Sequence, residues 1–310
     1  MRIAVIGAGG VGGYFGGKLA LAGHDVTFVA RGRQLEALRA RGLRIETAGT
    51  TLSVPTQGAV EDIAAVGPAD VTMLCVKLWD VEPTAPRLAP LVRDGGVVIP
   101  FQNGVESHEV LRRILGPRHV LGGIAYIAAT LREPGVVAQT GSMARLVVGA
   151  FEPEQAPRAE AFAAVCGGAG IDCSVAPDVR VALWSKYVFL AALSGCTSLA
   201  RQPVGVIRSD PDLRATMATA MHEIVAVAHA QGVLLPEGFV ARQLAFLDGL
   251  PAEMRSSMQN DLAAGSRLEA PWLAGGVARM GRAAGVPTPV NSTIYAAMKP
   301  YVDGTVVKDR

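Results

Sequence analysis

The feature that most constrains the fold of this chain is the glycine-rich run "GAGGVG" at residues 7–12. It follows the apolar run "RIAVI", which is typical of a strand, and opens the helix-like stretch "VGGYFGGKLALAG". In a G-x-G-x-x-G turn, Gly7 makes the tight turn, Gly9 lets the backbone approach a pyrophosphate, and Gly12 lets helix and strand pack closely. The helix N-terminus then offers N–H groups to the anion. This order of elements predicts a dinucleotide site; the alternative is a glycine-rich turn without a ligand.

The first half of the chain alternates β-type runs with helical patterns. Further strands are expected at 25–31, 70–76 and 97–102, and helices at 80–92 and 105–115. Such alternation predicts a parallel sheet covered by helices. Inside this pattern, residues 43–54 predict a small hairpin, and residues 136–149 predict a second antiparallel pair.

After about residue 175 the sequence is rich in alanine, leucine and methionine and has few strand signals. One helix is marked at its start by Ser209 or Asp210 before Pro211 and at its end by Gly232. We therefore predict an α/β fold: an N-terminal Rossmann-type dinucleotide-binding domain over residues 1–175, then an all-α domain over residues 176–310. The tail, residues 302–310, is expected to be lightly packed.

Composition excludes several classes of protein. Half of the 310 residues are hydrophobic and 18% are charged, so a large core is expected. The net charge is +2 and no basic block stands out, which argues against a nucleic-acid or membrane-surface protein. The four cysteines lack metal-like spacing, the histidines form no cluster and the N-terminus lacks a secretory pattern, so we expect a cytoplasmic protein without a metal.

The end of the second strand points to NADP. "FVARGR" places Arg31 where an NAD-binding protein normally carries an acid, with Arg33 close behind. Arg33 could equally be a solvated residue at the start of a helix. A guanidinium can form paired, charge-assisted hydrogen bonds with a 2′-phosphate, whereas an acid would repel it. Lys77 and Asn103 also follow the carboxyl ends of predicted strands, where ligands bind in open α/β sheets. The alternatives are an exposed lysine and an Asn-Gly turn.

Lys186 is the only charged residue between Val181 and Ala200. Its helical neighbours, among them Leu183 and Phe189, are apolar. Either the lysine extends to water past these neighbours, or it is held in a pocket for a chemical reason. The uncharged run that follows it is about 14 residues long, shorter than the ~20 that a membrane span needs. A buried helix without a membrane role is therefore expected.

With these pieces the whole chain resembles the ketopantoate reductase (2-dehydropantoate 2-reductase) family. The resemblance rests on "GAGGVG", Arg31, Lys77, "QNG" at Asn103, "LWSK" at Lys186, and "SSMQNDLAAGSRLE", which ends at Glu269. It implies that NADPH and a 2-oxo acid meet in a cleft between a Rossmann domain and a helical domain.

The resemblance also implies roles for individual residues. Lys186 would be the general acid and the partner of the substrate carboxylate. Asn103 would lie near the nicotinamide and orient substrate or lysine, and Glu269 would lie by the nicotinamide ribose. Ser257 would contact the substrate, and Lys77 would lie on the cofactor side. Apolar neighbours would lower the pKa of the lysine, while Glu269 would oppose them.

Three positions depart from the family pattern. Well-studied members have asparagines four and eight residues after the lysine and another in the following turn, where this chain has Leu190, Ser194 and Val204. An apolar leucine cannot hydrogen-bond a substrate hydroxyl or carboxylate, and such differences discriminate strongly between substrates. We therefore expect a substrate pocket that includes Leu190 and Ser194 and is less polar on that wall.

Three functions remain open from the sequence. The first is NADPH-dependent reduction of a small-molecule 2-oxo acid, with ketopantoate of pantothenate biosynthesis leading and a more apolar 2-oxo acid as the variant. The second is a non-catalytic NADP sensor, which would keep its function when Lys186 is replaced by alanine. The third is an opine-type dehydrogenase, which an amine-dependent oxidation of NADPH would reveal. The apolar helical domain is also compatible with a homodimer.

Overall fold

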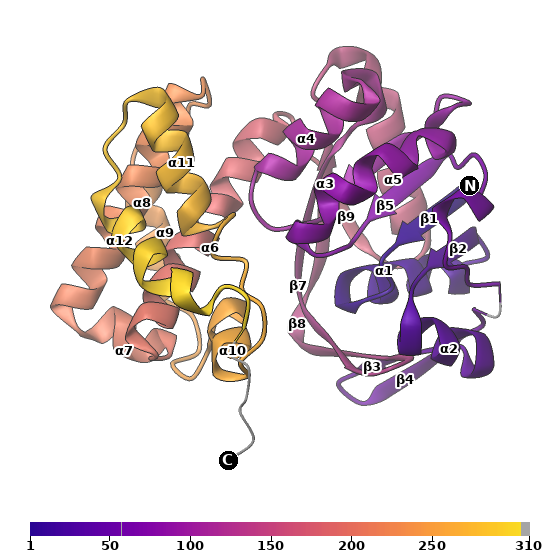
Figure 1. Ribbon diagram of the computed structural model, residues 1–310, viewed down its shortest axis with the longest axis horizontal. Coiled ribbons are helices and arrows are strands. Elements are labelled where there is room, and N and C mark those ends of the chain that lie inside the picture. Colours follow the sequence, from indigo (N-terminus) through magenta and orange to yellow (C-terminus); the bar gives the residue numbers. More distant parts are fainter. Residues whose placement is uncertain (57, 305–310) are drawn as a thin grey trace. The chain divides into compact units, whose positions relative to one another are not determined.

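The computed structural model describes residues 1–56 and 58–304 and divides the chain into two compact units (Figure 1). The first unit comprises Met1–Gln102 and Ser107–Arg180, and the second comprises Asn103–Glu106 and the chain from Val181 on. The segment 103–106, which the sequence pattern left inside the first domain, thus packs with the second unit. Residues 305–310 of the predicted tail lie outside the described part.

The first unit contains a fully parallel sheet of four strands in the order β2-β1-β5-β6. Its strands are β1 (Arg2–Ile6), β2 (Asp25–Val29), β5 (Val71–Leu74) and β6 (Val97–Pro100). Every residue of β5 and β6 is buried, as expected for strands that are covered on both faces. The parallel sheet predicted from the strand-helix alternation is confirmed.

A second sheet of five strands lies in the same unit, with the order β4-β3-β8-β7 and β9 paired with β8. Its strands are β3 (Leu43–Thr47), β4 (Thr50–Val54), β7 (Gly122–Glu133), β8 (Val136–Gly149) and β9 (Asp172–Val175). The hairpin predicted over residues 43–54 is confirmed as the antiparallel pair β3–β4.

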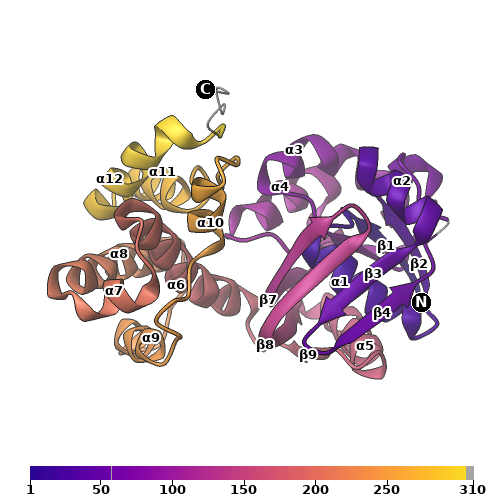
Figure 2. The same cartoon turned by 90° about the horizontal axis from the view of Figure 1, so that it is seen from below.

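The antiparallel pair predicted inside residues 136–149 is wrong. This segment is one long strand, β8, which pairs with β7 along its length (Figure 2). Gly141, near the middle of this segment, has a φ of 71°. The pairing register shifts here, because Ile127 pairs with Ala144 and the next residue, Ala128, pairs with Thr140. The glycine therefore accommodates an irregularity in the strand, and the chain does not reverse.

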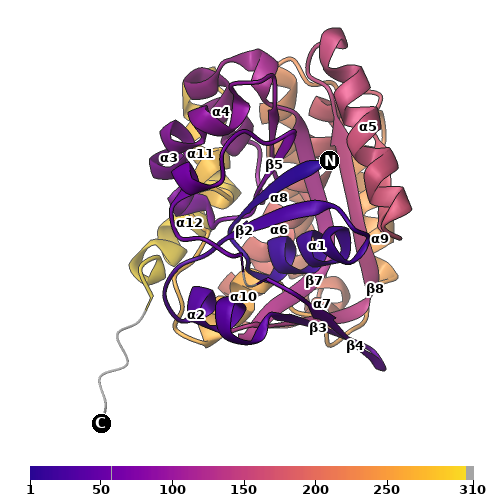
Figure 3. The same ribbon diagram turned by 90° about the vertical axis from the view of Figure 1, so that its right-hand side faces the viewer.

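Helix α1 (Gly10–Leu21; Figure 3) is rich in glycine, and its contacts with the two sheets of the first unit explain why. A Cβ added at Gly16 would lie 2.7 Å from Cγ2 of Val5 in the first sheet. A Cβ added at Gly13 would lie 2.7 Å from Cγ2 of Val137 in the second sheet. Both distances are shorter than side chains tolerate, so the glycines allow the helix to pack closely against both sheets.

The helix predicted at 80–92 is largely replaced by 3₁₀ structure. The α-helical part, α3 (Val81–Thr84), is one turn long and lies between 3₁₀ turns at Leu78–Asp80 and Ala85–Val92. Prolines cause the difference: Pro83, Pro86 and Pro90 have no N–H to donate to a preceding turn. The helix predicted at 105–115 is confirmed as α4 (Glu106–Leu115). Helices α2 (Gly32–Arg41) and α5 (Ala156–Gly168) complete the unit.

The described part of the second unit is built from helices, which confirms the predicted all-α domain. These helices are α6 (Val179–Ala200, whose first two residues belong to the first unit), α7 (Val204–Ser209), α8 (Pro211–Ala230), α9 (Phe239–Asp248), α10 (Ser257–Ala263), α11 (Ala274–Ala284) and α12 (Pro289–Met298). In α8, Asp210 caps the predicted N-terminus, and Met217 and Met221 are fully buried. The methionine face of α8 is thus part of the core.

Within the described residues, α6 alone is long and apolar enough to cross a membrane by length and composition. Of its most apolar 18-residue window, 61% is buried inside the structure. That burial is what the core helix of a folded domain shows. Residues Val188, Ala191 and Ala192 of α6 are completely buried in the apolar core of the second unit.

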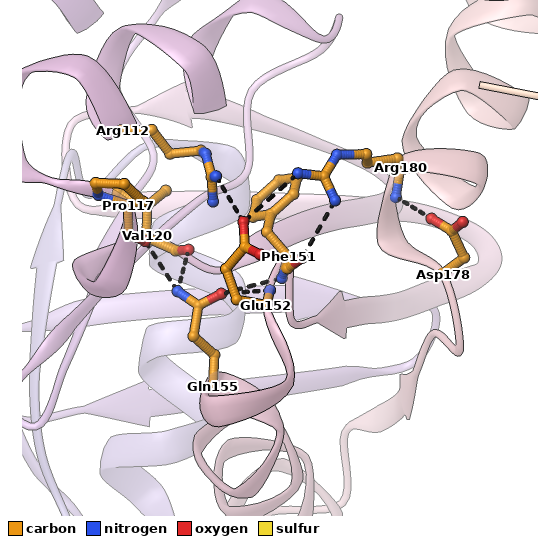
Figure 4. A network of polar contacts seen from close by, with 8 residues as sticks. All are labelled: Arg112, Pro117, Val120, Phe151, Glu152, Gln155, Asp178 and Arg180. Carbon is orange, nitrogen blue, oxygen red and sulfur yellow. Dashed lines mark hydrogen bonds and ion pairs between the residues drawn. The ribbon is translucent and has the colours of Figure 1, made fainter. Parts of the chain in front are cut away.

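A polar network in the first unit holds the start of α6 (Figure 4). The guanidinium groups of Arg112 and Arg180 lie 4.7 and 5.0 Å from the centre of the Phe151 ring. Both arginines also pair with the Glu152 carboxylate, at 2.9 and 3.7 Å. The Asp178 carboxylate accepts a hydrogen bond from the backbone N–H of Arg180 at 2.8 Å. The first turn of α6 is thereby fixed to the body of the first unit.

Candidate active site

The glycine turn has the geometry that its sequence predicts. Gly7 has a φ of 100°, a conformation that side chains disfavour, and its N–H donates to Val29 O at 3.0 Å. A Cβ on Gly12 would collide with the carbonyl oxygen of Gly7 and with the Val5 side chain. Apart from Gly9 and its two chain neighbours, no described heavy atom lies within 4 Å of a Cβ built on Gly9. This open space, at the N-terminus of α1, is where a pyrophosphate would approach the backbone. The residues therefore fit a dinucleotide.

Arg31 follows β2 at the N-terminus of α2 and is 77% exposed. Its Nη2 lies 2.7 Å from Oδ2 of Asp80, a residue that follows β5. Lys77 also follows β5, and its Nζ lies 5.7 Å from the centre of the Trp79 ring. The strands β2 and β5 flank β1, so these groups gather at the carboxyl edge of the sheet. The sequence analysis missed Asp80, because pairing across 49 residues leaves no local pattern.

In the second unit the structure brings together Asn103, Lys186 and Glu269. The Asn103 Oδ1 accepts a hydrogen bond from Lys186 Nζ at 3.2 Å, and its Nδ2 donates to Glu269 Oε2 at 3.1 Å. The amide thus connects a cation on one side with a carboxylate on the other. We call these three residues the Lys-Asn-Glu row.

The ionisation of Lys186 is shifted by this environment. Burial lowers the pKa of Lys186 to about 8, and the negative charge of Glu269 opposes the shift. The half-buried lysine is thus held by a polar partner in apolar surroundings. At neutral pH its ammonium is still mostly protonated, and its pKa lies near the working range of an enzyme. Such a group can both stabilise a nearby negative charge and release a proton.

The positions that depart from the family pattern have different surroundings. Leu190, four residues after Lys186 on α6, is partly buried. Ser194 is completely buried, and its Oγ has no hydrogen-bond partner among the described residues. Val204 is also completely buried, at the start of α7. Of the three, Leu190 is the residue that is not fully enclosed by the core.

The serine pair before α10 has two distinct positions. Ser256 caps the helix: its Oγ accepts a hydrogen bond from Gln259 N at 3.1 Å and lies 2.8 Å from Thr197 Oγ1. Ser257, the predicted substrate contact, is the exposed first residue of the helix. The buried serine therefore has a clear structural task, and the exposed one is accessible to a ligand.

Comparison with known proteins covers both units. A family model described as ketopantoate reductase PanE/ApbA matches residues 3–153, and its C-terminal counterpart matches residues 178–302. A 2-dehydropantoate 2-reductase of Archaeoglobus fulgidus is 34% identical, with 98% of each chain covered.

Solved structures agree with this assignment. A PanE/ApbA family ketopantoate reductase from Ralstonia eutropha has a TM-score of 0.88 at 33% identity, covering 97% of this chain and 98% of the other. A D-mandelate dehydrogenase bound to NADH and anilino(oxo)acetate has a TM-score of 0.89 at 19% identity, with 97% and 98% covered, and shares the fold. Both the N-terminal and the C-terminal family models match. The chain therefore belongs to the ketopantoate reductase family, a family of dinucleotide-dependent oxidoreductases that act on CH–OH groups.

Proposed function

We propose that this protein reduces a 2-oxo acid to the 2-hydroxy acid with NADPH, and that 2-dehydropantoate (ketopantoate) is the leading substrate. The observation that carries the proposal is the Lys-Asn-Glu row, in which Lys186 and Glu269 contact the two ends of the Asn103 amide. A non-catalytic NADP sensor would need the glycine turn and Arg31 but has no use for this row.

When bound, NADPH supplies the hydride that adds to the ketone carbon. The carbonyl π electrons then move to the oxygen, where negative charge develops. The Lys186 ammonium stabilises that charge and donates a proton to the oxygen, which completes the alcohol. A lysine with a pKa of about 8 suits this task, because its protonated form predominates at neutral pH and transfers its proton readily.

The other members of the row keep the lysine in place. The Asn103 carbonyl oxygen accepts a hydrogen bond from the ammonium, which limits the directions in which Nζ can point. The Glu269 carboxylate accepts a hydrogen bond from the other end of the same amide and so fixes its orientation. By its charge it also favours the protonated lysine. In the family assignment it would in addition order the nicotinamide ribose.

Arg31 supports NADPH as the cofactor, since its exposed guanidinium follows β2 and no carboxylate stands beside it in sequence. Lys77, exposed after β5, adds positive charge on the same sheet edge. Leu190 supports a variant of the proposal. It lies one turn from Lys186, and its apolar side chain favours a 2-oxo acid with a more apolar substituent than ketopantoate.

The test is steady-state oxidation of NADPH with ketopantoate beside a panel of apolar and aromatic 2-oxo acids. Lys186→Ala should lower kcat/KM by about 10²–10⁴-fold, while the Kd for NADPH, measured by fluorescence, should stay within about twofold. A wild-type protein that binds NADPH but reduces none of these acids would contradict the proposal. Turnover that requires an added amine would instead favour an imine-reducing dehydrogenase.

A further inference from the structure

We propose that Glu106, Tyr187 and Arg279 position Asn103 and Glu269 against Lys186, and we call these three residues the support cluster. The proposal rests on the proposed function, because it assigns to the support cluster the task of holding the Lys-Asn-Glu row. All six residues belong to the second unit.

Arg279, on α11, connects the two chain segments that carry Asn103 and Glu269. Its Nη2 lies 2.8 and 2.6 Å from the two carboxylate oxygens of Glu106, three residues after Asn103. Its Nη1 donates to the carbonyl oxygen of Pro271, two residues after Glu269, at 3.3 Å. One planar guanidinium thus sets the spacing between the two segments whose side chains meet in the row.

Tyr187 connects α6, which carries Lys186, with the segment after Glu269. It follows Lys186 directly and is 1% exposed. Its hydroxyl lies 3.0 Å from the carbonyl oxygen of Trp272 and 2.8 Å from that of Leu273, both just after Glu269. Burial raises the pKa of this hydroxyl well above its ordinary value, and the charge of Glu106 raises it further, so it stays protonated and able to donate.

The backbone near these side chains is shaped to admit them. A Cβ added at Gly276 would lie 2.8 Å from the Tyr187 hydroxyl and 3.1 Å from Oε2 of Glu106. Gly276 and Arg279 lie three residues apart, on one face of α11. Gly104, which follows Asn103, has a φ of 88°, and a Cβ added there would lie 3.9 Å from the Tyr187 ring. Gly276 therefore leaves room for the Tyr187 hydroxyl and the Glu106 carboxylate, and Gly104 allows the positive φ of the backbone after Asn103.

Partly exposed ion pairs contribute little to stability, but small errors in the position of a reacting group cost much activity. A displacement of about 1 Å can lower the rate about 100-fold. The Glu106–Arg279 ion pair of the support cluster therefore predicts a specific signature: its loss lowers kcat strongly and changes the melting temperature little.

The experiment compares Glu106→Gln and Arg279→Gln with the matched control Asp248→Asn. Asp248 forms a similar ion pair in the same unit, with Arg214 at 2.6 and 2.9 Å, between α8 and α9. We expect both cluster variants to lower kcat at least about tenfold with the melting temperature little changed, and the control to keep wild-type kcat. Arg279→Lys, which keeps the positive charge, should retain more kcat than Arg279→Gln. An equal loss in the control would overturn the proposal.

A double variant tests whether the Glu106–Arg279 ion pair acts through Asn103. In an Asn103→Ala background, Glu106→Gln should cause no further loss of kcat, because the amide that the pair positions is already absent. If the losses of kcat in the two single variants multiply in the double variant, Glu106 acts independently of Asn103, and the proposal is overturned. A wild-type protein without reductase activity would instead count against the proposed function.

A measurement without substrate further separates a failure of this inference from a failure of the proposed function. The rate at which Lys186 reacts with an amine-directed reagent, followed by peptide mass spectrometry across pH, reports its ionisation. Glu269 favours the charged lysine, so loosening the row through Arg279→Gln should move the midpoint to lower pH, whereas Asp248→Asn should leave it in place. An unmoved midpoint in Arg279→Gln would refute the inference even if the reaction itself proved different.

Discussion

The Nδ2 of Asn103 donates a hydrogen bond to Oε2 of Glu269 at 3.1 Å across 166 residues of sequence. The same amide accepts a hydrogen bond from Lys186 through its oxygen. A carboxylate and an ammonium are thereby coupled through a neutral amide, and the carboxylate can stabilise the cation through it. The coupling also makes the row sensitive to pH.

The first prediction concerns that sensitivity. In the proposed mechanism the active form of Lys186 is the protonated one, so kcat/KM for reduction should fall as pH rises through about 8, where the lysine loses its proton. Glu269→Gln removes the negative charge that raises the pKa, so the midpoint should move to lower pH. A pH–rate profile measures both midpoints. Glu237→Gln, which changes an exposed carboxylate of the same unit, is the control; an upward shift in Glu269→Gln would refute the assignment.

The second prediction concerns the choice of cofactor. Asp80 neutralises Arg31 at 2.7 Å and would repel a 2′-phosphate bound there. A phosphate with two negative charges, about 7 Å from the Asp80 carboxylate, would be repelled by about 1 kcal/mol in water. Asp80→Asn should therefore tighten NADPH binding about fivefold and change the Kd for NADH less.

Fluorescence titration measures the Kd for NADPH and the Kd for NADH, and hence the ratio of the two. Asp62→Asn, which removes the partner of Arg87 at 3.1 Å elsewhere in the first unit, is the matched control. A weaker affinity of Asp80→Asn for NADPH would show that Asp80 orients Arg31 toward the phosphate and does not compete with it.

The third prediction concerns the substrate. Leu190→Asn places an amide one turn from Lys186, where it can pair with a polar substrate group. The ratio of kcat/KM for ketopantoate to kcat/KM for an apolar 2-oxo acid should rise about tenfold or more. Leu190→Ala, which only opens space, should leave the ratio nearer the wild-type value. If both variants change the ratio equally, volume and not polarity governs selection at this position.

The fourth prediction separates stability from cofactor binding within one helix turn. Gly13→Ala would force a methyl group to 2.7 Å from Val137, so we expect a loss of about 1–3 kcal/mol in the free energy of unfolding. Gly9→Ala has open space around it in the described structure, so its stability should stay near that of the wild type. Its methyl group would occupy the approach to the pyrophosphate, so the Kd for NADPH should rise at least about tenfold. Denaturant unfolding and cofactor titration would check the two effects; a Gly9→Ala protein with normal affinity would contradict the site.

Local signals were enough to predict the first unit in outline. The strand, glycine turn and helix at its start follow from short-range chemistry, as does the 43–54 hairpin. The error at residues 136–149 arose because a glycine with positive φ marks a bulge and a turn alike. The prolines of residues 80–92 indicate that the segment is not a regular helix. The prediction followed the helical spacing of its apolar residues instead.

The site was predictable only where a motif names its residues. Lys186 stands out as a lone charge in an apolar segment, and Asn103 follows the carboxyl end of a predicted strand. Resemblance supplied Glu269 and the role of Asn103. Asp80, Glu106 and Arg279 gave no signal, since each acts through a partner far away in sequence. Long-range ion pairs of this kind follow from tertiary packing and cannot be predicted from composition or periodicity.

The short segment Asn103–Glu106 packs with the second unit, while both of its flanks belong to the first. The second unit is therefore discontinuous in the gene, and no single crossover point separates it from the first unit. A chimaera that exchanges everything after residue 180 between two relatives would combine Lys186 and Glu269 of one parent with Asn103 and Glu106 of the other. Recombination within this family is thus constrained by four codons that lie far upstream of the domain they complete.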